Sequence, residues 1–156
     1  MSKTIFILVG NIASGKSTLS REYVHIRESK VISRDAIRYM IGAGTYIFNP
    51  VLEPAIYQGT KALLEAFLKS GVEIVYDECN VSKSSRRSTI QLAKKYDYEV
   101  IAIELPKLSK EISVNRRLKD CHGPADRYTW NMVWDKFNSS YEHPSTSEGF
   151  DKVIEL

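Results

Sequence analysis

The chain has 156 residues, of which 43% are hydrophobic, so it can bury one sizeable core and has little room for a second domain. Lysine and arginine exceed aspartate and glutamate by only 22 to 19, a balance too even to indicate a nucleic-acid partner by itself. No run reaches the roughly 20 apolar residues of a membrane span, and no signal-peptide pattern is present. The 2 cysteines favour free thiols over a disulfide framework. We therefore expect a cytoplasmic protein without a membrane partner.

Strand and helix patterns alternate along the chain. Runs rich in β-branched residues predict buried strands, and apolar residues three and four apart predict helices. The expected strands are 3–9, 30–33, 73–76, 99–105 and 150–156, and the expected helices are 16–27, one capped by Asp35 and ended by Gly42, 56–69, 82–96, 109–118 and 126–137. This order predicts one α/β domain over residues 1–156, a parallel sheet with helices on both faces and ligands at the carboxyl ends of its strands.

Paired basic residues and two tryptophans are candidate functional features outside any motif. The pairs are Arg34 with Arg38, Arg86 with Arg87, and Arg116 with Arg117. Each pair follows a predicted element and can point toward one cleft, although a solvated helix face explains any single pair better. Trp130 and Trp134 lie four apart on a predicted helix, where we expect them to pack in a core.

Residues 10–17 match the phosphate-loop pattern G-x-x-x-x-G-K-[ST] at every fixed position, between a predicted strand and a predicted helix. The glycines let backbone N–H groups turn toward phosphates, Lys16 reaches the β and γ phosphates, and Ser17 offers a hydroxyl to Mg²⁺. We therefore expect ATP and Mg²⁺ as cofactors. The predicted nucleotide-binding residues are Gly10, Asn11, Ala13, Ser14, Gly15, Lys16, Ser17 and Thr18.

The phosphate loop does not identify the phosphoryl acceptor, so the acceptor must be inferred from other residues. Asp35 and Arg38 follow the second predicted strand and lie three apart, on one face of a helix. The carboxylate can accept the proton of an attacking hydroxyl, and the guanidinium can hold an acceptor phosphate with two hydrogen bonds. An N-cap at Asp35 with a surface salt bridge to Arg38 is an equally good explanation of the local sequence.

Four segments in this order resemble the kinase domain of the polynucleotide 5′-hydroxyl kinases, which include a bacteriophage enzyme and animal DNA-repair relatives. The segments are 10–17, 33–38, 77–80 and 148–151. The resemblance runs from Thr4 to Leu156 and implies a P-loop NTPase-like fold with a helical lid. It implies transfer of a phosphoryl group to the 5′ end of DNA or RNA. No D-x-D-x-T motif of the fused phosphatase domains is present.

On the acceptor side, the resemblance implies that Asp35 is the general base and that Arg38 holds the acceptor phosphate. Asn80 matches an asparagine that follows the Asp77 position in the family, and Arg34 directly precedes Asp35, so we predict both as substrate contacts. Cys79 stands where these kinases often have threonine, which puts a hydroxyl contact there in doubt.

The resemblance also implies a metal-binding carboxylate and a lid. Asp77 ends the third predicted strand, where it would act with Ser17 on Mg²⁺, although a plain turn residue is an alternative. Arg116 and Arg117 fit the start of a lid at about 116–127, whose arginine neutralises charge on the transferred group. The family's second lid arginine is absent near 119–122, and Arg127 is a candidate substitute.

Two other function classes stay open from the sequence. One is a related kinase of a modified base in nucleic acid, an aminoacyl-tRNA, a nucleoside or a small metabolite. The other is a nucleotide-dependent switch or binding module, for which the sequence offers no specific water-positioning residue. The sequence leaves the oligomeric state open and does not distinguish DNA from RNA.

Overall fold

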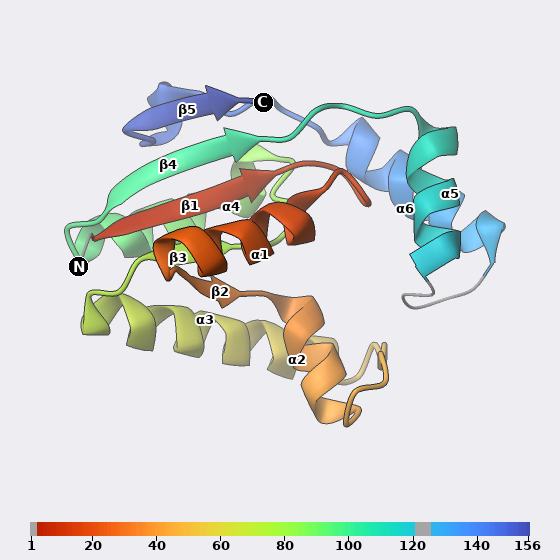
Figure 1. Ribbon diagram of the computed structural model, residues 1–156, viewed down its shortest axis with the longest axis horizontal. Helices are drawn as coiled ribbons and strands as arrows, with labels where there is room; N and C mark the ends of the chain where they lie inside the picture. Colours follow the sequence, from red (N-terminus) through yellow and green to blue (C-terminus); the bar gives the residue numbers. More distant parts are fainter. Residues whose placement is uncertain (1–2, 121–125) are drawn as a thin grey trace.

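The computed structural model describes residues 3–120 and 126–156. Their five strands form one parallel sheet in the order β2–β3–β1–β4–β5 (Figure 1). The strands are β1 (Thr4–Val9), β2 (Lys30–Ile32), β3 (Ile74–Tyr76), β4 (Glu99–Glu104) and β5 (Lys152–Glu155). In the central register Ile5 pairs with Ile74 on one side and with Val100 on the other. Because all five strands run the same way, their carboxyl ends meet at one edge.

Helices cover both faces of the sheet, as the alternating pattern predicted. Helix α1 (Lys16–Arg27) packs Leu19 and Tyr23 on the face that carries Phe6. Helices α3 (Glu53–Ser70) and α4 (Lys83–Lys95) pack on the opposite face, which carries Ile5 and Ile7. Successive side chains of a strand point to opposite faces, so burial of both faces requires the continuous apolar run of β1.

Three further helices lie beyond the carboxyl edge of the sheet. They are α2 (Arg34–Ile41), α5 (Lys110–Asp120) and α6 (Arg127–Ser139). Figure 1 shows α5 and α6 together past the ends of β1 and β4, with α2 at the end of β2. A small core of Ile12, Val114 and Trp130 joins α5 and α6 to the phosphate loop, and Trp134 packs against it. The expectation that both tryptophans serve packing is therefore confirmed.

Most predicted elements agree with the structure to within three residues at each end, and one capping assignment was wrong. The N-cap of α2 is Ser33, whose Oγ accepts a hydrogen bond from the Ala36 N–H at 3.4 Å, whereas Asp35 lies in the first turn. Ser33 has the extended backbone that an N-cap requires. Helix α3 begins three residues earlier than expected, with Pro54 in its first turn. The segment before β5 forms a short 3₁₀ helix, Thr146–Glu148.

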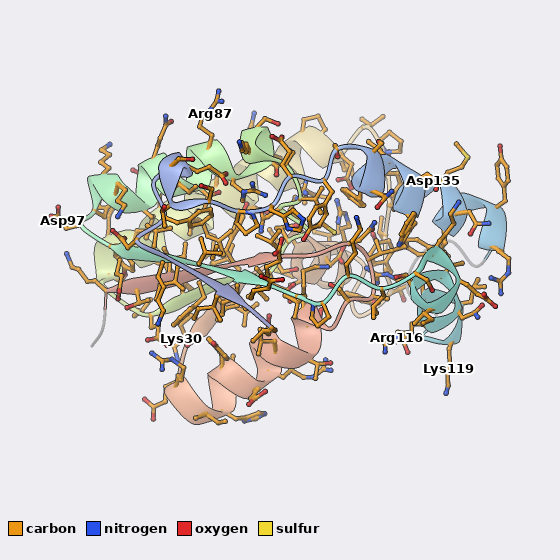
Figure 2. All side chains as sticks on the ribbon, turned by 90° about the horizontal axis from the view of Figure 1, so that it is seen from above. Lys30, Arg87, Asp97, Arg116, Lys119 and Asp135 are labelled. Carbon is orange, nitrogen blue, oxygen red and sulfur yellow. The ribbon has the colours of Figure 1, made fainter. Side chains whose placement is uncertain are left out.

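The interpretation of Arg86 and Arg87 as a solvated helix start was wrong for Arg86. Arg87 is exposed and points away from the sheet (Figure 2), but Arg86 is 0% exposed. Arg86 donates from Nε and Nη2 to the two carboxylate oxygens of Glu148, at 2.8 and 3.0 Å, and from Nη1 to the Asn80 carbonyl at 2.8 Å. These bonds tie the segment before β5 to the loop after β3, which explains how a charge is accommodated there.

The described residues contain no helix that is both long and apolar enough to span a membrane.

Candidate active site

The phosphate loop connects β1 to α1 and surrounds the Lys16 amine. Lys16 Nζ donates to the carbonyl oxygens of Gly10 and Asn11 at 3.0 and 2.7 Å, and to Ser14 Oγ at 3.3 Å. Gly15 has φ 103°, a left-handed conformation that glycine adopts without a Cβ clash, and it is the N-cap of α1. The loop therefore presents a lysine and a helix N-terminus to the same point, as an anion-binding site requires.

A cavity of about 240 Å³ opens beside this loop at the carboxyl edge of the sheet. Most of the residues predicted for the site meet there, although they come from separate parts of the chain. The predicted residues that line it are Ala13, Ser14, Gly15, Lys16, Ser17, Thr18, Asp35, Asp77, Arg116 and Arg117. The predicted residues Gly10, Asn11, Arg34, Arg38 and Asn80 are not part of its lining. Residues predicted for the donor side and for the acceptor side thus line one cavity.

Asp77 follows β3 and lies against α1. Its Oδ2 accepts a hydrogen bond from Ser20 Oγ at 2.9 Å. Burial raises the pKa of Asp77, while the hydrogen bond from Ser20, the charge of Lys16 and a hydrogen bond from Ser17 pull it back. A hydroxyl and a carboxylate are the hard oxygen donors that Mg²⁺ prefers, and substrate phosphates and water commonly complete its octahedron. Ser17 and Asp77 therefore fit a Mg²⁺ site.

Asp35 lies in the first turn of α2, and its side chain is 44% exposed. Its Oδ1 accepts a hydrogen bond from Arg38 Nη1 at 2.6 Å and a long one from the Tyr46 hydroxyl at 3.4 Å. Burial and the charge of Asp35 raise the pKa of Tyr46 to about 12, so this hydroxyl keeps its proton and donates. The carboxylate is held in place yet reachable from the cavity, as a general base must be.

Arg38 is 9% exposed, so its contact with Asp35 is not the surface salt bridge considered from the sequence. Its guanidinium also donates to Glu53, from Nε at 3.0 Å and from Nη2 at 2.5 Å. Burial lowers the pKa of Arg38, but its hydrogen bonds to Glu53 and Asp35 and neighbouring negative charge raise it overall. Two carboxylates therefore already hold the arginine that was predicted to bind an acceptor phosphate.

Arg34 and Glu78 form a second acid–base contact at this edge. Glu78 Oε1 accepts a hydrogen bond from the Arg34 backbone N–H at 2.7 Å and forms an ion pair with Arg34 Nε, 3.1 Å away. Burial raises the pKa of Glu78, and Arg34 lowers it. Glu78 lines the cavity, yet sequence reasoning gave it no role. The sequence feature that could have identified Glu78 is its position directly after Asp77, at a strand end where ligands bind.

Asn80 has φ 49° and is 6% exposed. Its Nδ2 donates to the carbonyl oxygens of Leu8 at 2.8 Å and Glu78 at 3.2 Å. These bonds connect the loop after β3 to β1. They make Asn80 a scaffold contact, and its role as a substrate ligand stays a prediction.

The predicted lid begins on α5. Arg116 is exposed and donates from Nη1 to the Ala13 carbonyl at 3.2 Å, and Arg117 lines the cavity with it (Figure 2 shows Arg116). Arg127 donates to Asn115 Oδ1 at 2.7 Å and is not in the cavity lining. Residues 121–125 of the predicted lid lie outside the described residues.

A family model described as "AAA domain" matches residues 5–144. The chain belongs to this family. This AAA-domain chain is 24% identical over 152 residues to the "Bifunctional polynucleotide phosphatase/kinase" of Schizosaccharomyces pombe. The aligned residues cover 97% of this chain and 33% of that protein. The chain thus spans about a third of the length of this curated relative.

Solved structures share the fold of this AAA domain. A chain of a "Pnkp1/Rnl/Hen1 complex" is 26% identical, with a TM-score of 0.62 over 81% of this chain and 41% of that one. A gluconokinase from Sinorhizobium meliloti 1021 shares the fold at 16% identity, with a TM-score of 0.62 over 99% of this chain and 82% of that one. The domain has a P-loop kinase fold, and the resemblance to polynucleotide kinases is confirmed.

Proposed function

We propose that this domain transfers the γ-phosphoryl group of ATP to the 5′-hydroxyl end of DNA or RNA. The observation that carries the proposal is that Asp35, the phosphate-loop Lys16 and the α5 arginine Arg117 line one cavity. A phosphoryl transfer needs a base for the acceptor, cations for the donor phosphates and a cation for charge that develops between them. Similarity to a polynucleotide phosphatase/kinase supports a polynucleotide as the acceptor.

Each residue has a defined step in the proposed reaction. Asp35 accepts the proton of the 5′-hydroxyl as its oxygen forms the new bond to the γ-phosphorus, and the bond to the β-phosphate oxygen breaks to release ADP. Lys16 and Arg117 offset the negative charge on the phosphates and on the transferred group. Ser17 and Asp77 would hold Mg²⁺, which would supply positive charge to the β and γ phosphates.

The test is end-labelling of 5′-hydroxyl oligonucleotides with γ-labelled ATP. Wild-type protein is expected to label DNA or RNA ends, and Asp35→Asn to reduce turnover at least about 10²-fold while binding a fluorescent ADP analogue normally. Asp97→Asn is a matched control, because Asp97 is an exposed acid at the opposite end of the molecule (Figure 2). Unchanged turnover in Asp35→Asn rules out this carboxylate as the base.

A second acceptor class is favoured by the contacts of Arg38. Glu53 and Asp35 together occupy its Nε, Nη1 and Nη2. An acceptor without a phosphate, such as a nucleoside or a small metabolite, would not have to displace these carboxylates from the guanidinium. A competition assay separates the two classes. If nucleosides or polyols prevent labelling of an oligonucleotide and are themselves phosphorylated faster, the acceptor is a small molecule.

A further inference from the structure

Arg117 and Trp130 form a contact that the proposed chemistry does not yet explain. Arg117 lies on α5 and Trp130 on α6, and the guanidinium carbon lies 5.1 Å from the centre of the indole ring. This distance is within the range in which the ring face attracts a cation. The indole is 6% exposed and packs with Ile12 of the phosphate loop and Val114. The ring is therefore fixed relative to the loop that holds the donor phosphates.

Arg117 is bound differently from the acceptor-side arginines. Arg38 is paired with two carboxylates and Arg34 with one, so much of their charge is already neutralised. Within residues 3–120 and 126–156, no carboxylate forms an ion pair with Arg117, and its Nε is buried without a hydrogen-bond partner. An aromatic face holds a cation while leaving its N–H donors and most of its charge available.

The available charge of Arg117 acts on the cavity. Arg117 lines the cavity, and its charge lowers the pKa of Tyr39, Tyr46 and Cys79 against the larger effect of their burial. These groups lie on the acceptor side and at the end of β3. The guanidinium is thus placed where a negative phosphoryl group would pass between donor and acceptor.

We propose that Trp130 is a positioning residue for phosphoryl transfer, which acts by holding Arg117 over the transferred group without neutralising it. The inference rests on the proposed kinase reaction but not on the identity of the acceptor. A carboxylate in place of the indole would fix the arginine equally well, yet it would compete with the phosphoryl oxygens for the same donors. The indole avoids this competition, and its packing on Ile12 couples the position of the arginine to the phosphate loop.

The test compares Trp130→Phe, which keeps an aromatic face, with Trp130→Leu, which keeps an apolar side chain only. We expect Trp130→Leu to lower kcat about tenfold with the KM for ATP within about twofold, and Trp130→Phe to lower kcat only about threefold. Trp134→Leu is the matched control, because this second indole lies on the same helix with its ring against Lys110. Its kcat is expected to stay within about twofold of wild type. Thermal unfolding and binding of a fluorescent ADP analogue verify that each variant is folded.

The decisive measurement is a double-mutant cycle with Arg117→Ala. If Trp130 acts through Arg117, Trp130→Leu causes no further loss of kcat in the Arg117→Ala background. An equal loss in both backgrounds overturns the proposal and leaves Trp130 a packing residue. Labelling of oligonucleotide ends by the wild type tests the proposed function separately. If the wild type labels no end, the same cycle measured on Mg²⁺-dependent ATP hydrolysis still decides the role of Trp130.

Discussion

Arg38 donates two hydrogen bonds to Glu53, from Nε at 3.0 Å and from Nη2 at 2.5 Å, while its Nη1 contacts Asp35. The general-base candidate and a carboxylate of the next helix thus share one buried guanidinium. The cluster carries a net charge of about −1 when all three groups are ionised. An acceptor phosphate that approaches Arg38 must therefore compete with Glu53.

Replacement of Glu53 by glutamine tests this competition. The neutral amide binds the guanidinium less strongly, so Nε and Nη2 become available to a phosphate. We expect Glu53→Gln to lower the KM for a 5′-hydroxyl oligonucleotide about threefold, with kcat within about twofold because the Asp35 contact stays. The control is Glu65→Gln. Glu65 lies on the same helix, and its Oε1 is 3.8 Å from Lys69 Nζ. An increase in KM would instead show that Glu53 holds Arg38 in position for the acceptor.

The raised pKa of Asp77 predicts how stability depends on pH in Mg²⁺-free buffer. Because its pKa is higher in the folded state, its stabilising contribution is present below the ordinary value of about 4 and is lost as pH rises through the folded value. Asp77→Asn removes this titration. The free energy of unfolding of the wild type should therefore fall relative to that of the variant as pH rises through this window.

At neutral pH we expect Asp77→Asn to be as stable as the wild type or about 1 kcal/mol more stable, because a buried charge is removed. Its Mg²⁺-dependent binding of ATP should weaken at least about tenfold, since a neutral amide is a poorer ligand for the ion. Urea denaturation across pH 4 to 8 and magnesium titrations measure the two effects. A loss of more than about 2 kcal/mol at neutral pH would mean that the charged carboxylate stabilises the fold.

The ion pair between Arg86 and Glu148 predicts a large effect on stability. Glu148→Gln keeps the shape of the side chain but leaves the fully buried guanidinium without its counter-charge, so we expect a loss of about 3 kcal/mol. Asp135→Asn, which breaks an exposed pair with Lys110, should cost less than about 1 kcal/mol. Urea denaturation at neutral pH compares the two variants. Equal losses would show that the buried pair adds nothing beyond a surface contact.

Local sequence signals predicted the position of the phosphate loop because its residues lie within one short segment. Gly15, Lys16 and Ser17 follow a strand and open a helix, and their spacing fixes their geometry before any other part of the chain is considered. The end of α2 at Gly42 was predictable for the same reason. The capping error at Asp35 was also local, since Ser33 is an equally good cap two residues earlier.

The contacts of the buried arginines were predicted only in part, because they join residues far apart in the chain. Glu53 reaches Arg38 across 15 positions, and Glu148 reaches Arg86 across 62, and no local pattern distinguishes these carboxylates from exposed ones. Burial of Arg86 depends on the segment before β5 returning over α4. From the sequence alone, Arg86 beside Arg87 therefore looked like half of a solvated basic pair.

The sequence by itself determined that the chain forms a parallel α/β domain with a phosphate loop at a strand end, because strand burial, helix periodicity and the loop spacing are local properties. Only the tertiary structure decided the strand order β2–β3–β1–β4–β5, which brings the ends of β1, β2 and β3 to one cavity. It also decided which charges are neutralised there. Arg38 faces two carboxylates and Arg117 faces an indole because packing of separate helices, rather than residue type, selects the partner of each guanidinium.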